Sequence, residues 1–405
     1  MTSQGDTLDD AISRVVDQGN CSGCGACVLL DSGLRMTLDS DGYNRPERKT
    51  EAIPPNDAIS RFSAMCPGVV VRAQRPAGSK RHPTMGSYFE AFEAWATDEQ
   101  VRHAGSSGGA LTALSSWLVS TGEASRVVGA TADPESPRRT VSIEITTKAR
   151  ALELAGSRYA PSSNASGHAA LDPSAAFVGK PCEVSALRAM HKDSGPLLLS
   201  FFCAGTPSQH ATDSLVVALG VPDDEPIRDL WYRGKGWPGK FTVLRRDGST
   251  VDTSYEQSWG SALGPTVQWR CKICADGVGE SADVTAADFW RTDNRGYPDF
   301  SEGQGVSAII ARTARGVDVI RRAEAAGVLI ISPIDVADLA VIQPLQRQRR
   351  ETLIGRLVGT RAAGGRVPRY RGFSLTQMAL PRLREVFRTA KGSYRRRRVR
   401  GNSVD

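Results

Sequence analysis

Long hydrophobic runs are absent from this chain of 405 residues. No apolar stretch approaches the roughly 20 residues that a membrane-spanning helix needs. The first ten residues, MTSQGDTLDD, have neither the cationic nor the apolar segment of a secretory signal peptide. We therefore expect a cytoplasmic protein without a membrane span, and the length predicts two or three domains with ample core.

Histidine is also scarce. The chain has 5 histidines, and no two of them stand at a spacing typical of metal ligands. His103, which precedes a glycine-rich loop, is the one candidate for moving a proton. A histidine-based metal centre is therefore not indicated.

Acidic residues are nearly missing from the C-terminal part. Residues 341–405 contain 17 Lys and Arg but 3 acidic residues, whereas residues 1–340 contain 34 and 41, and the net charge of the chain is +7. We expect a solvated, disordered tail that ends in Tyr394-Arg-Arg-Arg-Arg398-Val-Arg400; the alternative is a docking arm for an acidic partner, such as a ferredoxin, or for a polyanion. Nucleic acid is not favoured, because the tail lacks interleaved aromatic residues and the rest of the chain is acidic.

Cysteine occurs 8 times, and four of these residues form one pattern. Cys21, Cys24 and Cys27 follow one another at two-residue gaps, separated by small residues, and Cys66 precedes a proline. In a reducing compartment, cysteines hold metals or act in catalysis more often than they form disulfides. Three closely spaced thiolates followed by a distant Cys-Pro pair are typical of one complete 4Fe-4S cluster.

The other four cysteines are Cys182, Cys203, Cys271 and Cys274. The last two form a Cys-x-x-Cys pair at the spacing of metal ligands. Two sets of four thiols is the simplest partition, so we expect a second 4Fe-4S cluster. A zinc site with four cysteines, buried structural thiols and a catalytic use of these thiols are the alternatives.

A loop of glycine and serine, Gly105-Ser106-Ser107-Gly108-Gly109, precedes an apolar helical pattern. Free N–H groups and the positive end of a helix dipole attract anions, and the phosphates of a nucleotide cofactor are the natural ligand here. A simple tight turn is the alternative. A second small loop, Ser157-Arg158-Tyr159, adds one guanidinium and one aromatic ring.

The sequence predicts a mixture of helices and strands. Apolar periodicity predicts a helix over residues 8–16, capped by Thr7. From residue 176 onward, predicted strands alternate with predicted helices. Cys182 and Cys203 lie just past the carboxyl ends of two of these strands, where open α/β sheets gather their functional groups.

These motifs together resemble those of a known family. The ordered landmarks are the Gly105–Gly109 loop, Ser157-Arg158-Tyr159, Gly179-Lys-Pro-Cys182, Cys203-Ala-Gly205, Trp237, Cys271-x-x-Cys274, Ala282-Asp283-Val284 and Gly303-Gln-Gly305-Val-Ser307. From the cysteine turn to about Pro333, the chain resembles the beta subunit of coenzyme F-420-dependent hydrogenases and formate dehydrogenases. Ferredoxin-dependent divinyl chlorophyllide reductase and 7-hydroxymethyl chlorophyll a reductase belong to the same group. The chain departs from the pattern at Ala287-Asp288, where members often have Gly-Asp, and in the basic extension after Val341.

The resemblance implies an iron–sulfur flavoprotein in which FAD lies near a cluster and exchanges electrons with a deazaflavin coenzyme, a pigment or a partner protein. It makes the Gly105–Gly109 loop, together with Ser157, Arg158 and Tyr159, a candidate flavin contact. It makes Cys182, Cys203, Cys271 and Cys274 candidate ligands of the C-terminal cluster. Lys180 and Arg158 are candidates to stabilise an anionic reduced flavin, with plain surface charge as the alternative, and His103 is a candidate proton donor.

We therefore expect an α+β protein that begins with a small ferredoxin-like iron–sulfur module over residues 1–75. A mixed α/β body that binds flavin and cluster follows, with the flavin loop in residues 76–170, the second cysteine set in residues 171–340, and a basic extension over residues 341–405.

The expected function is that of an oxidoreductase that passes electrons between two 4Fe-4S clusters, FAD and a two-electron acceptor, foremost coenzyme F-420. A ferredoxin-like carrier or a partner hydrogenase or dehydrogenase subunit is the expected protein partner. The alternatives are a ferredoxin-dependent reductase of a pigment or other organic substrate, a non-catalytic electron-transfer subunit of a larger complex, and a zinc-stabilised module that binds a polyanion.

Overall fold

The computed structural model describes residues 7–191, 194–289 and 303–401, and side chains up to residue 398. The acidic start of the chain therefore lies partly outside the described residues. Across the described ranges, the search for a helix with the length and apolarity of a membrane span finds none.

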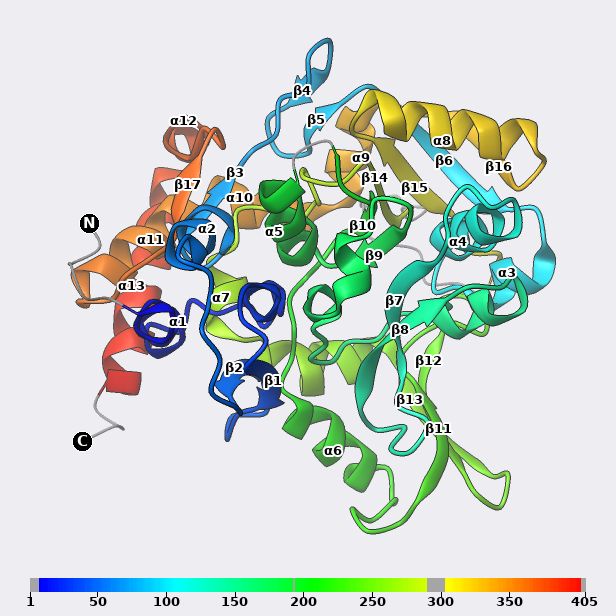
Figure 1. Cartoon of the computed structure of the whole chain (residues 1–405), viewed down its shortest axis with the longest axis horizontal. Helices are drawn as coiled ribbons and strands as arrows, with labels where there is room; N and C mark the ends of the chain where they lie inside the picture. The colour runs from blue at the N-terminus through cyan, green and yellow to red at the C-terminus, as the bar shows by residue number, and fades with distance from the viewer. Residues whose placement is uncertain (1–6, 192–193, 290–302, 402–405) are drawn as a thin grey trace.

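A mixed sheet of eight strands forms the centre of the molecule (Figure 1). Its strands β7, β9, β10 and β14 run parallel, and the others pair antiparallel. In spatial order the strands are β16 (Leu329–Pro333), β6 (Glu90–Ala96), β15 (Ser307–Ala311), β14 (Val284–Asp288), β10 (Leu197–Phe201), β9 (Ala176–Gly179), β7 (Val127–Ala132) and β8 (Thr140–Ile145). The expectation of a mixed α/β body is confirmed.

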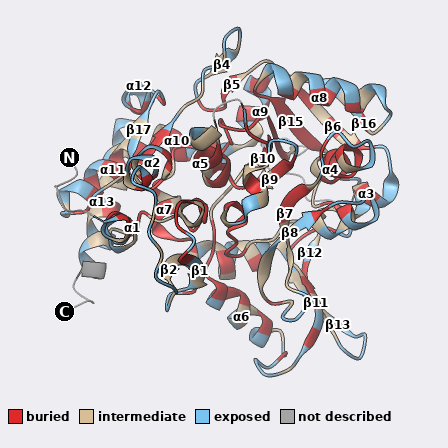
Figure 2. Ribbon diagram, in the orientation of Figure 1, coloured by how far each residue is buried: buried red, intermediate tan, exposed pale blue. Residues whose placement is uncertain are grey.

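The sheet is covered on both faces, as Figure 2 shows by its buried strands. In β10, Leu197 and Leu199 face one apolar cluster, which includes residues of α4 (Ala110–Ser120) and α8 (Ala314–Ala325). Leu198 faces the opposite cluster, which includes residues of α5 (Pro181–His191). A strand buried on both faces is expected to be continuously apolar, which explains the unbroken run of leucines.

The N-terminal segment packs on the same side of the sheet as α5. It contains α1 (Leu8–Asp17), the hairpin β1 (Leu34–Leu38) and β2 (Asn44–Arg48), α2 (Ala58–Met65) and β3 (Val70–Arg72). The predicted cap of the first helix is confirmed, because Asp10 N donates to Thr7 Oγ1 at 3.1 Å and Thr7 N donates to Asp10 Oδ2 at 2.9 Å. This capping box satisfies two backbone donors that the helix start leaves open. The ferredoxin-like arrangement of this segment stays a prediction.

A smaller antiparallel sheet extends from the body, at the lower right of Figure 1. It consists of β11 (Ile227–Trp231), β12 (Lys240–Arg245) and β13 (Thr250–Ser254), and the last two pair as an antiparallel hairpin. A π-helical segment, Glu256–Leu263, follows it and brings Trp259 back toward the body. The helix α6 (Gln209–Ala218) lies beside this sheet.

The expectation of a disordered C-terminal tail is wrong. The extension begins at the end of α9 (Val336–Ile342) and forms α10 (Pro344–Glu351), α11 (Leu353–Ala362), β17 (Arg369–Arg371), α12 (Leu375–Ala379) and α13 (Leu383–Gly401). Leu353 and Leu357 of α11 share an apolar cluster with Trp269 and Ile273 of the body, and β17 pairs in parallel with β3. The extension is ordered because it contributes part of a core whose other half lies far away in the sequence.

The helices α11 and α13 approach each other very closely. A Cβ atom added at Gly359 would lie 2.1 Å from the carbonyl oxygen of Ala390, and one at Gly355 would lie 2.2 Å from that of Val386. Only glycine fits at such a crossing. The arginine-rich helix is thereby held against the body, at the left of Figure 1.

Candidate functional site

The first cysteine set lies between α1 and α2. Cys21, Cys24 and Cys27 follow α1 in a turn, and Cys66 is the C-terminal cap residue of α2. All four side chains line one small cavity, which Phe62 and other apolar residues complete. The structure thus brings together the four thiols that the sequence pattern predicted as one ligand set.

Two glycines shape this turn. Gly23 and Gly25 have φ angles of +70° and +85°, in the left-handed region that favours glycine. A Cβ at Gly25 would lie 2.8 Å from Cβ of Ser166, and one at Gly23 would lie 2.9 Å from the carbonyl oxygen of Asn44. The turn is therefore wrapped tightly by the rest of the chain.

The surroundings of the first set are unfavourable for bare thiolates. Burial raises the pKa of the Cys24 thiol to about 11. Burial also raises the pKa of Cys27 and of Cys66, and the charges of the neighbouring thiols raise both further. Four thiols that share one apolar pocket suit a cationic metal cluster, because the metal charge would offset the burial and the mutual repulsion that raise these pKa values.

The second set gathers at the carboxyl edge of the sheet. Cys203 follows β10, Cys271 lies in the short helix α7 (Trp269–Lys272), and Cys274 comes just after it. Thr206 N donates to Cys271 Sγ at 3.4 Å. Burial raises the pKa of Cys203 to about 12. A Cβ at Gly205 would lie 3.1 Å from Cβ of Cys271, so the loop that carries Cys203 contacts the segment of Cys271 and Cys274.

Cys182 stands between the two sets. It lies in the first turn of α5, and burial raises the pKa of its thiol well above the ordinary value. The charge of Lys180 opposes this shift, while the charges of Cys24 and Cys271 add to it. Cys182 also packs against the same apolar cluster as Cys21, Cys24, Cys27 and Cys66, so this member of the second set is a neighbour of the first set.

A single metal ion would need several ligands around one point. In the described ranges of the chain, no group of three or more His, Cys, Asp or Glu side chains is spaced to hold such an ion.

The glycine loop borders a large candidate binding space. A cavity of about 450 Å³ runs from Gly105–Gly109 past Ser157–Ala160 to Cys203 and Ala204. Gly109 has a φ angle of +72°, and a Cβ at Gly105 would lie 2.8 Å from Cα of Gly109. The loop is thus a tight turn, and the N-terminus of α4 that follows it lies at the cavity. A tight turn at this place does not exclude a phosphate-binding loop.

The loop is anchored from behind by β15 and the residue that precedes it. Gly108 N donates to Ser307 Oγ at 3.0 Å, and Ser107 Oγ donates to Val306 O at 2.6 Å. From the cavity side, Ser157 Oγ donates to Ser106 Oγ at 2.8 Å. Three sequence landmarks, the glycine loop, the Ser157 loop and the segment that ends at Ser307, are therefore parts of one wall.

Arg158 lines the cavity, but its guanidinium forms hydrogen bonds with other protein groups. It donates to Thr140 Oγ1 at 2.8 Å and to three backbone carbonyls, those of Leu230, Pro137 and Arg139. Burial lowers the pKa of this guanidinium from its ordinary value. The contacts indicate that Arg158 fixes the loop from Ser157 to Tyr159 in place.

Lys180 is buried at the same cavity. Its Nζ donates to the carbonyl and to the hydroxyl oxygen of Ser162, both at 2.7 Å, and pairs with Glu183 Oε1 at 2.8 Å. Burial lowers the pKa of this amine, but the charges of Glu183 and Cys182 more than offset that effect and raise it above the ordinary value. Lys180 is therefore a fixed positive charge between the cavity and the second cysteine set.

His103 is exposed and lies at a different cavity, of about 620 Å³, on the other side of the glycine loop. Gly105 and Ser107 line both cavities. The loop is thus a thin partition with His103 on one side and Lys180 on the other.

Sequence reasoning missed Arg233, which is almost fully buried at the cavity wall. Its guanidinium donates to Asp288 Oδ2 at 2.7 Å and to the carbonyl oxygen of Ser106 in the glycine loop. Burial lowers its pKa, but the charge of Asp288 and other neighbours more than offset this and raise it. The only signal in the sequence was its place within a glycine-rich stretch before Trp237.

Aromatic side chains form the wall beside Arg233. The ring centroids of Tyr159 and Trp259 are 4.9 Å apart, and those of Tyr159 and Tyr255 are 6.3 Å apart. The guanidinium of Arg233 lies 4.9 Å from the Tyr255 ring centroid. Such a wall offers flat apolar faces to a planar ring system.

The C-terminal extension also reaches this site. Gln343 and Gln346 line the cavity. Arg349 donates to the carbonyl oxygens of Cys203 at 2.8 Å and of Ala204 at 3.1 Å, and Gln346 Nε2 donates to that of Cys203 at 3.2 Å. The helix α10 thus holds the loop that carries Cys203.

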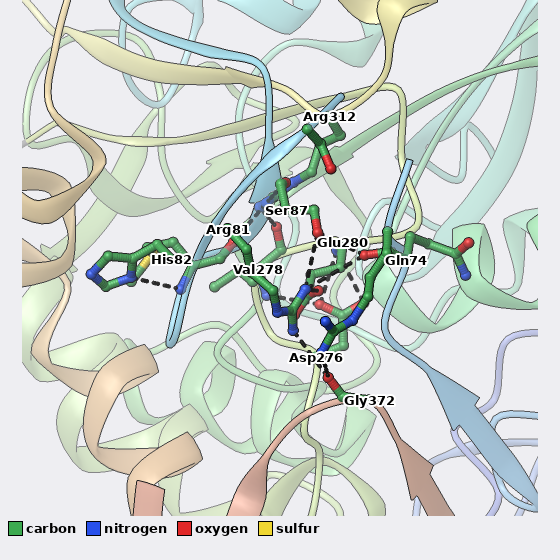
Figure 3. A network of polar contacts seen from close by, with 12 residues as sticks. Gln74, Arg81, His82, Ser87, Asp276, Val278, Glu280, Arg312 and Gly372 are labelled. Atoms are coloured by element: carbon green, nitrogen blue, oxygen red, sulfur yellow. Dashed lines mark hydrogen bonds and ion pairs between the residues drawn. The ribbon is translucent and has the colours of Figure 1, made fainter. Parts of the chain in front are cut away.

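A buried ionic network supports the turn after Cys274 (Figure 3). The carboxylate of Glu280 is fully buried and pairs with Arg81 at 2.8 Å and with Arg350 of α10. Arg312 donates to the carbonyl oxygens of Ser87 and of other residues around it. Burial would raise the pKa of Glu280, but the charges of the three arginines lower it below the ordinary value.

Two family models match the chain, and both describe the beta subunit of coenzyme F420 hydrogenase/dehydrogenase. The model of its N-terminal part matches residues 91–167, and the model of its C-terminal part matches residues 173–337. The protein is therefore an oxidoreductase that transfers electrons. It belongs to the coenzyme F420 hydrogenase/dehydrogenase beta-subunit family, as its motifs indicated.

A solved structure supports the fold. The chain is similar to one from a structure described as a xenon derivatization of the F420-reducing NiFe hydrogenase complex from Methanosarcina barkeri, with a TM-score of 0.51 and 20% identity. The match covers 67% of this chain and 91% of that chain. A search of curated proteins finds no match.

Proposed function

We propose that this protein passes electrons between two 4Fe-4S clusters, an FAD and a two-electron partner, most directly coenzyme F-420. The observation that carries the proposal is that the first cysteine set, the second cysteine set and the cavity of the glycine loop adjoin one another. Cys182 packs against the apolar cluster that contains Cys24 of the first set, Thr206 in the loop after Cys203 contacts Cys271, and Cys203 itself lines the cavity of the glycine loop.

The two cysteine sets would hold the clusters. The four thiols of the first set line one pocket, and burial raises the pKa of Cys24, of Cys182 and of Cys203, which fits the donor chemistry of iron–sulfur centres. When bound, clusters exchange single electrons, and a flavin links such steps to the two-electron chemistry of a deazaflavin.

The cavity fits a flavin nucleotide. The Gly105–Gly109 loop and the start of α4 present backbone N–H groups suited to phosphates. Tyr159, Tyr255 and Trp259 offer a wall for a planar ring. Lys180 would place its positive charge near the electron-rich end of such a ring, and Arg158 would position the Ser157–Tyr159 loop.

His103 has a separate proposed role. It faces the cavity across the glycine loop, where Trp95 and Trp237 also lie. A deazaflavin substrate on that side would be next to His103, which is exposed and free to exchange a proton with solvent.

The protein also fits one subunit of a larger assembly, because the solved structure that it resembles is described as a hydrogenase complex. In that case the substrate of the assembly would be processed on another subunit, and this chain would deliver the electrons.

Addition of reduced F-420 to anaerobically purified protein tests the proposal. We expect bleaching of flavin absorbance followed by bleaching of the cluster absorbance, since the cavity precedes the cysteine sets on this route. Protein that contains flavin and iron but shows no spectral change with reduced F-420 would rule out F-420 as the direct partner and favour the role within a larger assembly.

A further inference from the structure

The C-terminal extension carries an exposed basic surface. On α13, Arg384, Arg388, Lys391 and Arg395 recur at helical spacing, and all four are exposed. Within the described residues none of them forms an ion pair with an acid, and the two described acids of the extension, Glu351 and Glu385, both pair with Arg382. This stripe therefore presents uncompensated positive charge.

Apolar side chains lie beside the basic stripe. Phe387 is 73% exposed, Leu383 is 52% exposed and Leu380, just before the helix, is 62% exposed. Large apolar residues with charged residues around them are typical of surfaces that bind proteins.

The same extension touches the chain on both sides of the first cysteine set. Arg366 N and Arg397 Nη2 donate to Gln18 Oε1 at 2.9 and 3.2 Å, and Asn20 Nδ2 donates to the carbonyl oxygen of Arg366 at 3.0 Å. These contacts lie immediately before Cys21.

On the other side, β17 pairs with β3, so that Arg369 lies opposite Val70, four residues after Cys66. Arg366, Arg369 and Arg371 are exposed. Positive charge thus continues from α13 to both edges of the site that Cys21 and Cys66 delimit.

We propose that this surface, Arg384, Arg388, Lys391 and Arg395 with Phe387, docks an acidic one-electron carrier protein next to the first cysteine set. The inference rests on the proposed function, because it assumes a redox centre at that set. Each docking event passes one electron from the reduced carrier, which becomes oxidised, to that centre, and no bond forms or breaks. Positive charge attracts an acidic partner and steers its approach, while Phe387 anchors it.

The test uses the full chain, purified anaerobically, and a small acidic two-cluster ferredoxin in its oxidised form as the probe. Binding is measured by calorimetry at low and at moderate salt. We expect the triple variant Arg384→Glu/Arg388→Glu/Lys391→Glu to bind the probe at least about tenfold more weakly than the wild type at low salt. Raising the salt should weaken wild-type binding in the same direction.

A matched control reverses three exposed charges elsewhere, Lys148→Glu/Arg228→Glu/Arg246→Glu, on the side of β8 and the small sheet (Figure 1). We expect this variant to bind the probe within about twofold of the wild type. Equal weakening in both triple variants would show a nonspecific effect of net charge and would overturn the proposal.

Iron content and reduction by dithionite separate this inference from the proposed function. Protein without iron ends the proposed function itself. Protein whose clusters accept electrons from dithionite, but whose α13 variant binds the probe as well as the wild type, overturns the docking surface alone. Preferential binding of single-stranded RNA or anionic vesicles, lost in the α13 variant while ferredoxin binding is absent, overturns it too.

Discussion

At the scale of single residues, we expect each cysteine set to hold its cluster independently of the other set. The Cys66→Ser change removes a thiol from the first set and leaves the contacts of Cys203, Cys271 and Cys274 untouched. We expect the iron content to fall by about half, from about eight to about four atoms per chain. Colorimetric iron and sulfide analysis checks this. Loss of all iron, with the fold retained, would mean that the two sets do not act separately.

The glycine loop gives a second prediction at this scale. A Cβ at Gly109 would lie 2.7 Å from the carbonyl oxygen of Val101, and its φ angle is +72°. The Gly109→Ala change must therefore distort the loop, and we expect flavin content to fall at least about tenfold with the far-UV circular dichroism unchanged.

Gly122 provides the control for that experiment. It has a similar φ angle of +76°, but a Cβ there would meet nothing within 4 Å. The Gly122→Ala change carries the same kind of backbone strain at the other end of α4 without touching the cavity. If both variants lose flavin equally, the effect comes from helix stability, and the loop is not the binding element.

At the scale of elements, α10 positions the second cysteine set. Arg349 donates to two carbonyl oxygens of the loop that carries Cys203. The Arg349→Met change removes the donor to the Ala204 carbonyl and leaves the Cys203 carbonyl with Gln346 alone, which costs about 1–3 kcal/mol. We expect faster loss of iron from the second set to a chelator, followed by the decay of cluster absorbance.

Arg347 lies on the same helix, and no hydrogen bond or ion pair is formed by its side chain among the described residues. The Arg347→Met change should therefore leave the rate of iron loss at the wild-type value. Equal rates for the two variants would contradict a role of α10 in holding the Cys203 loop.

Sequence patterns predicted the elements whose signals are local. The cap and the apolar spacing indicate the helix after Thr7, and three consecutive leucines indicate the strand Leu197–Phe201. The four thiols of the first set line one cavity, and the sequence pattern could group them because their spacing is local. These predictions needed no knowledge of distant residues.

The missed features depend on distant partners. In the sequence, Leu353 and Leu357 belong to a polar, arginine-rich stretch. Their role in the core becomes evident only from their packing against Trp269 and Ile273. Arg233 becomes a site residue only through contact with Ser106 and Asp288. No local pattern reports such contacts, because they are set by the tertiary fold.

At the scale of the whole molecule, the network around Glu280 joins three distant parts of the chain: Arg81 from the segment before β5 (Gly86–Tyr88), Arg312 from the end of β15, and Arg350 from α10. The Glu280→Gln change would leave buried arginine charge uncompensated, so we expect a loss of about 3–5 kcal/mol in the free energy of unfolding. Denaturant unfolding of the holoprotein measures this.

The same network predicts a dependence on pH. Because the pKa of Glu280 is lower in the folded than in the unfolded protein, its contribution is fully present above the unfolded pKa and disappears as the pH falls through the folded value. The exposed pair of Glu385 with Arg382 serves as a control, since the Glu385→Gln change should cost less than about 1 kcal/mol. Equal effects of the two changes would contradict a special role of the network.

The central claim is that two groups of four cysteines and one adjoining cavity form a single electron path. Iron, acid-labile sulfide, zinc and flavin analysis of anaerobically purified protein tests it most directly. The account predicts about eight irons, about eight sulfides and one FAD per chain. Fewer than four irons per chain, or zinc without sulfide, would contradict it.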